Sequence, residues 1–248
     1  MQNKLIISFI VSCVLCAPFA QAGFLNGIFY HGASVLPVAN VTVNGKSEKA
    51  VILGRERSGY DRGTWCDFGG RRDRGETADQ TAAREFSEEA NTGKALGMNT
   101  KAVFNHIDTK NNNTEAVIVK NIGTERKTGK PYHWVSYVTS FALLDVNNFV
   151  TRFNQARLAS GQSRVYQEKD GLAMVMWHDL KSAIEGFPSD DNHVWVKANE
   201  FDLTKNPPEK KENSRILLRP SFVNSLRPYI TNQSYKQDAQ DSKVRYYA

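Results

Sequence analysis

Apolar residues recur at a helical period in the segment 77–92. Four of them, spaced four apart, form one stripe along a helix: Ala78, Ala82, Phe86 and Ala90. Thr77 and Gln80 stand at the start of this stripe with the spacing of a capping box, Thr-x-x-Gln. The pattern predicts an amphipathic helix that begins after Thr77 and packs its apolar stripe against a sheet.

Short apolar or alternating runs predict strands elsewhere in the chain. Residues 38–43 alternate between apolar and polar, and Asn44-Gly45 then supplies a tight-turn signal. Further strands are expected at 50–53, 101–107, 116–119, 133–144 and 172–177. Helical spacing or a Pro start predicts later helices at 146–161, 177–184 and 221–230, with a polar loop at 206–213. This alternation predicts an α/β fold with a mixed sheet flanked by helices.

The N-terminus has the layout of a secretory signal peptide. Lys4 precedes the apolar run 5–16, and Ala20-Gln21-Ala22 gives the small-x-small pattern of a cleavage site. We therefore expect 1–22 to be a signal peptide and the protein to be exported, either periplasmic or secreted, with an uncleaved anchor as the alternative. No later segment is long and apolar enough to cross a bilayer, so no stable membrane span is expected after cleavage.

Residues 23–230 are expected to form one domain, with an N-terminal hairpin and a helical insertion near 146–161, followed by a disordered tail at 231–248. Cys66 is the only cysteine beyond the signal peptide, which excludes an intramolecular disulfide, and we interpret it as a small buried residue. The net charge of +6 fits a polyanionic ligand, but its dispersion argues against binding to duplex nucleic acid.

Three glutamates follow Arg84 on the predicted helix. Glu85, Glu88 and Glu89 stand at i, i+3 and i+4, which brings their carboxylates to one side of the helix, beside its apolar stripe. Like charges repel at this spacing, but a divalent cation reverses the sign of that cost. Hard cations such as Mg²⁺ commonly bridge carboxylates to substrate phosphates. The cluster predicts a metal site for phosphate chemistry, and a solvated acidic helix face is the alternative.

The segment resembles the Nudix box. That pattern is Gly, five residues, Glu, seven residues, Arg-Glu, an apolar residue, any residue, Glu-Glu, any residue, Gly and an apolar residue. Gly70, Glu76, Arg84-Glu85, Phe86 and Glu88-Glu89 occupy its fixed positions at the required spacing. Asn91 and Thr92 depart from the Gly-apolar ending, and Phe68 stands where a proline often precedes the two glycines. Because Asn tolerates the left-handed conformation that ends a helix, we expect the turn to be retained.

The resemblance implies a Nudix-type α/β/α sandwich and a diphosphohydrolase. It implies that Glu85, Glu88 and Glu89, with the carbonyl oxygen of Gly70, hold Mg²⁺ or Mn²⁺. It also implies that Arg84 orients Glu85 and that Glu76 supports the loop before the helix. The general base varies within the family, so both Glu85 and Glu168, in the loop before a late strand, are candidates. For Glu168 the alternative is a solvated loop residue.

The substrate is defined only as a class. Arg71 and Arg72, in a cluster with Arg74, are candidates for phosphate binding or for a solvated loop. Trp134 and Tyr137 lie three apart on a predicted strand and so on opposite faces; at most one faces the cleft, and core packing is favoured for both. The resemblance implies a small-molecule nucleoside diphosphate derivative: a nucleotide sugar, an ADP-ribose-like molecule or a dinucleoside polyphosphate. An RNA 5′-end pyrophosphohydrolase and a non-catalytic binding module remain alternatives.

Overall fold

One large mixed sheet organises the protein. The computed structural model describes residues 24–25, 28–108, 113–124, 129, 131–141, 144–159, 168–187, 193–231, 236–237 and 244–247. The strands are β1 (Phe24–Leu25), β2 (Ile28–Val43), β3 (Lys46–Glu56), β4 (Trp65–Cys66), β5 (Phe68–Arg71), β6 (Thr114–Thr124), β7 (Pro131–Ser140), β8 (Lys169–Met176), β9 (Trp195–Asp202), β10 (Glu209–Leu217), β11 (Lys236–Gln237) and β12 (Val244–Tyr247). The helices are α1 (Ala78–Glu89), α2 (Thr92–Ala95), α3 (Thr100–Ile107), α4 (Val146–Ala159), α5 (Trp177–Gly186) and α6 (Pro220–Ile230).

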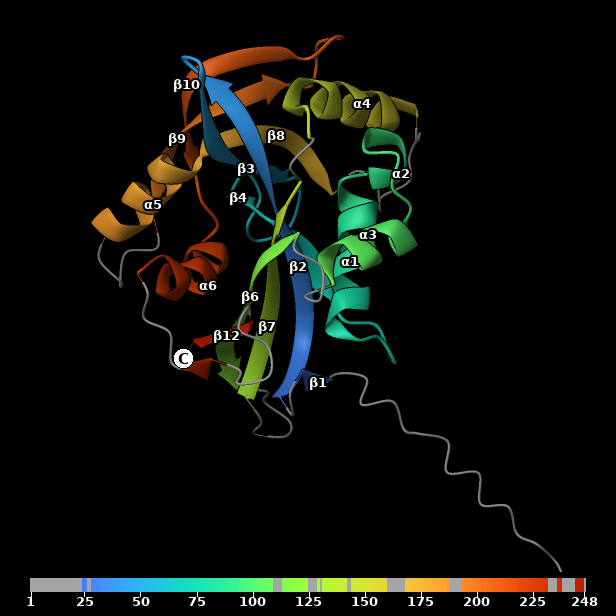
Figure 1. The fold of residues 1–248 in the computed structure, drawn as a ribbon, viewed down its shortest axis with the longest axis vertical. Coiled ribbons are helices and arrows are strands. Elements are labelled where there is room, and N and C mark those ends of the chain that lie inside the picture. Colours follow the sequence, from blue (N-terminus) through green and yellow to red (C-terminus); the bar gives the residue numbers. More distant parts are fainter. Residues whose placement is uncertain are drawn as a thin grey trace, which may run out of the picture.

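The long strands β2 and β3 are at the centre of the sheet, whose main order is β10-β9-β8-β3-β2-β7-β6-β12-β11 (Figure 1). They form the expected hairpin, and Asn44 and Gly45 turn it with φ angles of 51° and 76°. The pairs β2–β7 and β6–β12 are parallel, and the other pairs are antiparallel, so the sheet is mixed as expected. The short strand β5 pairs with β2 and leads directly towards α1.

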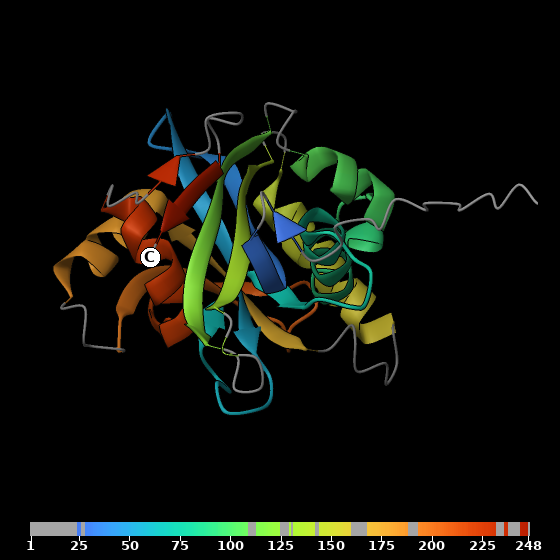
Figure 2. The ribbon, with the colours of Figure 1, turned by 90° about the horizontal axis from the view of Figure 1, so that it is seen from below.

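Helices cover both faces of the sheet, as Figure 2 shows. Helices α1 to α4 lie on one face, where residues such as Phe86, Val103 and Phe149 pack with the sheet in one apolar core. Helices α5 and α6 lie on the other face, where Leu180 and Leu226 belong to a second core. The three layers confirm the α/β/α prediction, because apolar side chains of the sheet are buried on both sides.

Helix α1 forms as the sequence predicts. The Thr77 Oγ1 accepts a hydrogen bond from the Gln80 N–H (3.4 Å), and the Gln80 Oε1 accepts one from the Thr77 N–H (2.9 Å), which completes the capping box. Ala82 and Phe86 are buried against the sheet. Beyond the helix, Asn91 adopts the left-handed conformation with φ at 50°, so the turn expected despite the missing glycine is present.

Four predictions about the elements are wrong at least in part. Residues 101–107 belong to α3 and not to a strand, because Asn99 caps the helix and its Val103 and Ile107 pack four residues apart. The expected loop 206–213 is largely the start of β10, whose polar residues pair with β9 at the edge of the sheet. The strand expected to reach 144 ends at Ser140. The tail, expected to be disordered, contains β11 and β12, and β12 extends the sheet beside β6.

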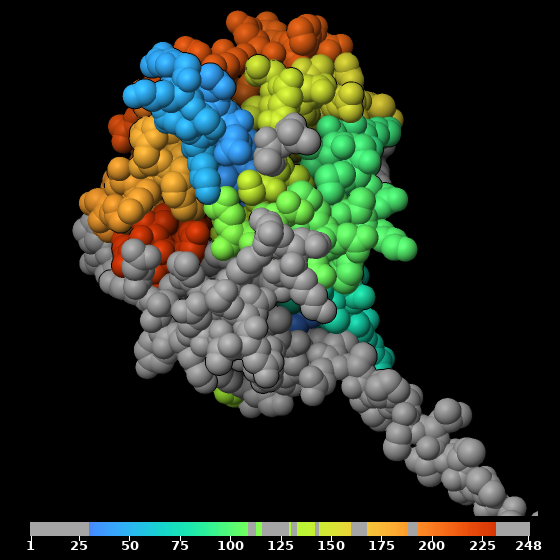
Figure 3. Space-filling model, viewed as in Figure 1, coloured from blue at the N-terminus to red at the C-terminus, as the bar shows by residue number. Residues whose placement is uncertain are grey.

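Other predictions lie partly or wholly outside the described residues. The predicted signal peptide, 1–22, lies wholly outside them. The predicted insertion helix is present as α4, but its last two residues, 160–161, lie outside the described part of the chain. No helix in the described part of the chain has the length and apolar character needed to cross a membrane. The space-filling view in Figure 3 shows α4 beside the outer strands β9 and β10 at one end of the molecule.

Candidate active site

Arg84 connects the glutamates at the centre of the predicted box. Its Nη1 lies 2.8 Å from Glu85 Oε1 and 3.4 Å from Glu88 Oε2, and its Nε donates to Glu76 Oε1 at 2.8 Å. Its Nη2 also donates to the carbonyl oxygen of Arg71, at 3.0 Å. The guanidinium therefore fixes Glu85 against the loop that precedes α1, which is the orientation that the sequence predicts for this pair.

Glu76 holds that loop together. One carboxylate oxygen accepts hydrogen bonds from the Asp73 N–H and the Thr81 hydroxyl, each at 3.0 Å, and Arg84 donates to both oxygens. Burial acts to raise the pKa of Glu76, but the hydrogen bonds from Arg84, Asp73 and Thr81 outweigh it and keep that pKa below its ordinary value. Glu76 is therefore a charged support for the helix start, as expected.

Glu85 lies directly against Gly70 of β5. A Cβ atom at position 70 would come within 2.4 Å of the Glu85 carboxylate, so only glycine allows this approach. Burial raises the pKa of Glu85, the charges of Glu88 and Glu168 add to this, and Arg84 opposes them. The structure thus brings together four residues that the sequence predicts for the site: Gly70, Glu85, Glu88 and Glu168.

Glu168 is placed beside these acids by the start of β8. Its carbonyl oxygen accepts a hydrogen bond from the Arg57 N–H at 3.0 Å, which ties the segment to the end of β3. Burial raises the pKa of Glu168, with Glu56 and Glu88 contributing and Lys169 opposing. Glu168 is an exposed residue in the bend before β8 and lies within electrostatic reach of Glu88, so its surroundings suit both the candidate base and the solvated-loop alternative.

Glu89 points inward, away from the exposed side of α1. Its side chain is only 4% exposed, its Oε2 accepts a hydrogen bond from the Gly69 N–H at 2.7 Å, and its Oε1 lies 3.4 Å from the Lys169 Nζ. Burial raises the pKa of Glu89 to about 8, with the charges of Glu56 and Glu85 adding to the effect of burial. The third glutamate is thus shared between the predicted metal site and a buried lysine.

Lys169 is the functional-site residue that the sequence does not reveal. It is 1% exposed, and its Nζ lies 2.7 Å from Glu56 Oε1 and 3.3 Å from the Cys66 sulfur. Cys66 is buried as predicted, and burial raises the pKa of its thiol. The sequence places Lys169 next to Glu168, in the loop before a late strand, so only the three-dimensional pairing of β3 with β8 identifies Lys169 as buried.

Carboxylates are the donors that a hard divalent cation prefers, so the residue types of the site, but not their arrangement in this structure, fit such an ion. The negative charges of Glu88 and Glu168 raise the pKa of Glu85, and that of Glu88 raises the pKa of Glu168. These carboxylates therefore repel one another, and a bound cation would relieve the repulsion. Among the described residues, no group of three or more His, Cys, Asp or Glu side chains is arranged to hold a metal ion. Arg84 and Lys169 contact Glu85, Glu88 and Glu89 in this structure, so the metal ligation by these glutamates and Gly70 stays a prediction.

Comparison with models of protein families identifies the family of this chain. Residues 35–217 match the family model described as NUDIX domain, which covers more than half of the chain. The chain belongs to the Nudix family. The predicted resemblance and fold class are confirmed, and the protein is a Nudix hydrolase, with α1 as its Nudix helix.

Solved structures with a similar fold include a mutT/nudix family protein from Listeria innocua (15% identity, TM-score 0.34, covering 63% of this chain and 81% of that one). A MutT/nudix family protein from Enterococcus faecalis shares 10% identity, with a TM-score of 0.36, over 83% of this chain and 63% of that one. The NUDIX domain of Shewanella oneidensis NrtR, complexed with ADP ribose, shares 13% identity, with a TM-score of 0.29, over 47% and 62%. A search of curated proteins gives no match. At these values the structural likenesses carry no argument about substrate.

A cavity of about 290 Å³ adjoins the Nudix loop. It is lined by Cys66, Asp67, Gly69, Gly70, Arg71, Trp134, Arg219, Ser221, Phe222 and Ser225. The Trp134 Nε1 donates to the Ser34 hydroxyl at 3.0 Å, and the Ser34 Oγ donates to the buried Asp67 Oδ2 at 2.6 Å. This chain of hydrogen bonds fixes the indole at the cavity wall next to Gly70.

The structure separates the aromatic and basic candidates. Trp134 is partly exposed at the cavity, whereas Tyr137 is buried in the core beneath α1, so core packing is confirmed for Tyr137 and is wrong for Trp134. Arg71 is exposed and lines the cavity. Arg72 instead lies over the ring of Tyr30, with its guanidinium carbon 5.6 Å from the ring centroid. Of the two predicted phosphate contacts, only Arg71 lines the cavity.

Proposed function

We propose that this Nudix hydrolase cleaves a diphosphate linkage in a nucleoside diphosphate derivative, with Mg²⁺ or Mn²⁺ bound to the Nudix helix. The observation that carries the proposal is the Arg84-anchored carboxylate of Glu85, packed against Gly70 and within electrostatic reach of Glu88 and Glu168. Carboxylates held this close together repel one another, and a bound cation would remove this repulsion.

The metal would be held by Glu85, Glu88 and Glu89 with the Gly70 carbonyl oxygen. When bound, it neutralises negative charge on the phosphoryl oxygens that accumulates as water attacks phosphorus. Arg84 keeps Glu85 in place through its short ion pair. Lys169 favours the ionised form of Glu56, whose pKa it holds below the ordinary value, and it opposes the burial that raises the pKa of Glu89.

Glu168 is the preferred candidate for positioning and deprotonating the attacking water. A general base works best when its pKa lies near the working pH, and burial with neighbouring acids shifts the pKa of Glu168 upward in that direction. Glu85 is also shifted upward, but its carboxylate contacts Arg84 and Gly70. This difference in surroundings favours Glu168 as the base and Glu85 as a ligand.

The cavity beside Gly70 suits the nucleoside part of the substrate. Trp134 offers an aromatic surface held by Ser34, and Arg71 offers a cation for a phosphate close to the Nudix loop. Nucleotide sugars, ADP-ribose-like molecules and dinucleoside polyphosphates all carry a base that can stack and a diphosphate bridge that can reach the acids. These are the substrate classes that we propose.

The decisive assay is turnover by purified protein on a panel of such substrates and of RNA with a 5′-triphosphate. We expect release of a nucleoside monophosphate with Mg²⁺ or Mn²⁺ and loss of release with EDTA. Turnover of the RNA alone would replace the small-molecule proposal with 5′-end processing. Metal-independent turnover, or no turnover of any substrate with metal present, would contradict the proposed hydrolase.

We further propose that the enzyme acts outside the cytoplasm after cleavage behind Ala22. The support is the sequence of the first residues, where Lys4, an apolar run and Ala20-Gln21-Ala22 are arranged as in a signal peptide. Mass spectrometry of the native, fractionated protein should find Gly23 at the N-terminus. An intact Met1 in protein recovered from the exported fraction would overturn this proposal.

A further inference from the structure

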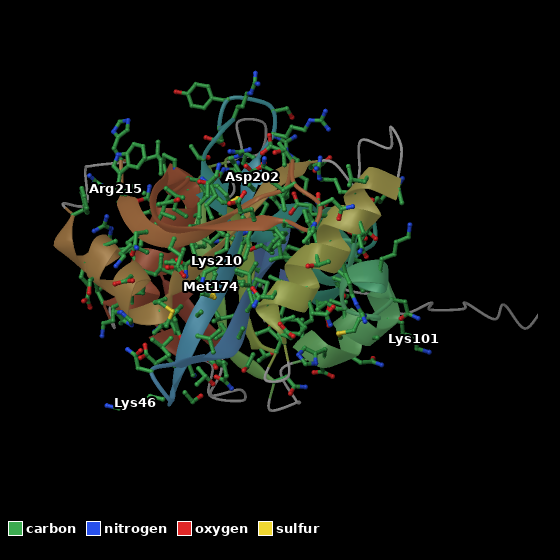
Figure 4. The ribbon with its side chains drawn as sticks, turned by 90° about the horizontal axis from the view of Figure 1, so that it is seen from above. Lys46, Lys101, Met174, Asp202, Lys210 and Arg215 are labelled. Carbon is green, nitrogen blue, oxygen red and sulfur yellow. The ribbon has the colours of Figure 1, made fainter. Side chains whose placement is uncertain are left out.

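A cavity of about 400 Å³ lies between α2, α3 and the first turns of α4. Helix α2 contacts both α3 and α4, and Figure 4 shows α4 on this side of the molecule, with Lys101 of α3 at the outer edge. None of the described residues that line this cavity also lines the cavity beside Gly70. A molecule bound here would therefore not occupy the proposed substrate cavity.

Aromatic and aliphatic side chains form the floor and walls of this cavity. Phe141 and Phe149 line it and are 6% and 2% exposed. The half-buried Leu96, Met98 and Leu144 add apolar walls that remain partly open to solvent. Cavities of this size, with mainly apolar walls and a few polar groups, are typical of small-molecule sites.

His106 adds a flat ring whose orientation is fixed. It stacks on Phe141, with the ring centroids 4.4 Å apart and the planes 21° apart. Its Nε2 lies 3.1 Å from the Ser140 carbonyl oxygen and donates to it, because a carbonyl oxygen can only accept. Burial lowers the pKa of His106, and the hydrogen bond to Ser140 opposes this, so the ring is uncharged near neutral pH. Because His106 and Phe141 both line the cavity, they favour a ligand with an aromatic ring.

Helix α4 supplies charge at the rim. Asn148 and Arg152 are exposed, line the cavity and lie four residues apart, on the same side of the helix. Asp145 also lines the cavity, but its Oδ1 accepts hydrogen bonds from the N–H groups of Asn147 and Asn148, at 3.0 and 3.2 Å. The partial positive charge of the helix start therefore offsets this carboxylate.

Arg152 is the one cation among the described residues that line the cavity. A guanidinium binds a carboxylate or a similar planar acidic group through two parallel hydrogen bonds. The rim therefore favours an anionic group, whereas the floor favours an aromatic ring. An acyl chain would use the apolar walls without the ring stack, and a free phosphate would use neither.

We propose that the cavity between α2, α3 and α4 binds a small aromatic anion. Its ring packs against His106 and Phe141, and its acidic group contacts Arg152. The site is separate from the Nudix glutamates, so this proposal stands or falls independently of the proposed hydrolase activity.

The first test measures binding of 8-anilinonaphthalene-1-sulfonate to the folded protein in EDTA, by the rise in its fluorescence. We expect one probe per chain, with a dissociation constant of roughly 10⁻⁵–10⁻⁴ M for a ligand of this size. Met98→Glu places a negative charge in the apolar wall and should weaken binding by about tenfold or more. Leu158→Glu is the matched control and should bind like wild type, because Leu158 is 57% exposed on α4 and does not line the cavity.

The second test separates the anionic group from the ring. Arg152→Gln should weaken binding of the sulfonate probe by about tenfold, as for loss of one charge-assisted contact. The same variant should bind N-phenyl-1-naphthylamine, which has the same rings without the sulfonate, within about twofold of wild type. Lys101→Gln removes an exposed positive charge from α3 that does not line the cavity, and it should bind both probes like wild type.

Four results would overturn the proposal. The first is no binding of the sulfonate probe to wild type, and the second is equal affinity in wild type and Arg152→Gln. The third is equal weakening of both probes by Arg152→Gln, because Arg152 would then act through packing and not through its charge. The fourth is weakening by Arg71→Gln in place of Met98→Glu, because the probe would then lie in the cavity beside Gly70. The melting temperature of Met98→Glu is measured alongside, and if that variant unfolds, the exposed Arg152 and Lys101 variants decide the question.

Discussion

The Nζ of Lys169 lies 3.4 Å from Oε1 of Glu89, so a buried lysine on β8 contacts the last glutamate of the Nudix helix. The same Nζ lies 2.7 Å from Glu56 of β3. The contact joins the helix to the strand that follows Glu168, and so it couples the position of the proposed base to the position of the proposed metal ligands. Movement of β8 would disturb both together.

Replacing Lys169 by Met should destabilise the fold strongly. Met has a similar length, but the change leaves Glu56 and Glu89 buried without their cation, and breaking a buried pair in this way costs about 3–5 kcal/mol. Urea unfolding of the metal-free protein measures the free energy of unfolding. Lys181→Met is the control, because Lys181 is an exposed residue of α5 paired with Glu185. This control should change the free energy of unfolding by less than about 1 kcal/mol. Equal stability of the two variants would contradict the role of Lys169.

Metal affinity should rise with pH. The pKa of Glu89 is raised to about 8, and those of Glu85 and Glu168 are also raised, so protons compete with a cation for these carboxylates at higher pH than usual. Because a cation binds the ionised form, its apparent affinity falls as pH falls below about 8, and binding releases protons. Titration of Mn²⁺ by calorimetry in buffers of different ionisation enthalpy measures both effects. A pH-independent affinity between about pH 5 and 8 would show that these acids are not the ligands.

Glu168→Gln should lower kcat and leave the fold intact. The amide keeps the size of the side chain but cannot accept a proton, and loss of a general base typically costs about 10²–10⁴ in rate. The melting temperature should stay near that of wild type, because the substitution removes a negative charge that is repelled by Glu88 and Glu56. Unchanged kcat on a good substrate would exclude Glu168 as the base and leave Glu85 as the candidate.

Local signals explain why so much of the Nudix helix is predictable from sequence. Its cap at Thr77, its stripe through Phe86 and the Arg84–Glu85 contact all depend on residues close together in the chain. The hairpin at Asn44-Gly45 is set by its turn residues in the same way. These features need no knowledge of the rest of the fold.

Long-range contacts account for what the sequence does not show. Lys169 is buried only because β8 pairs with β3, and Trp134 reaches a cavity wall through a bond to Ser34, a hundred residues earlier in the chain. The segment 101–107 carries apolar residues compatible with either a strand or a helix, and the Asn99 cap with packing against α1 decides for the helix. The polar strand β10 has no apolar period because it is the edge of the main sheet.

The most direct test of the proposed mechanism is Glu88→Gln, measured as kcat/KM with Mn²⁺ and as melting temperature with and without metal. Like charges at i, i+3 and i+4 cost about 0.2–0.5 kcal/mol per close pair, so the metal-free variant should melt at or slightly above wild type. It should gain less stability from Mn²⁺ than wild type does, and its kcat/KM should fall by orders of magnitude. The control, Glu185→Gln on the exposed face of α5, should match wild type in kcat/KM and in melting temperature with and without metal. Near-normal activity of Glu88→Gln, or unfolding of the metal-free variant, would contradict the assignment of the Nudix glutamates as the metal site.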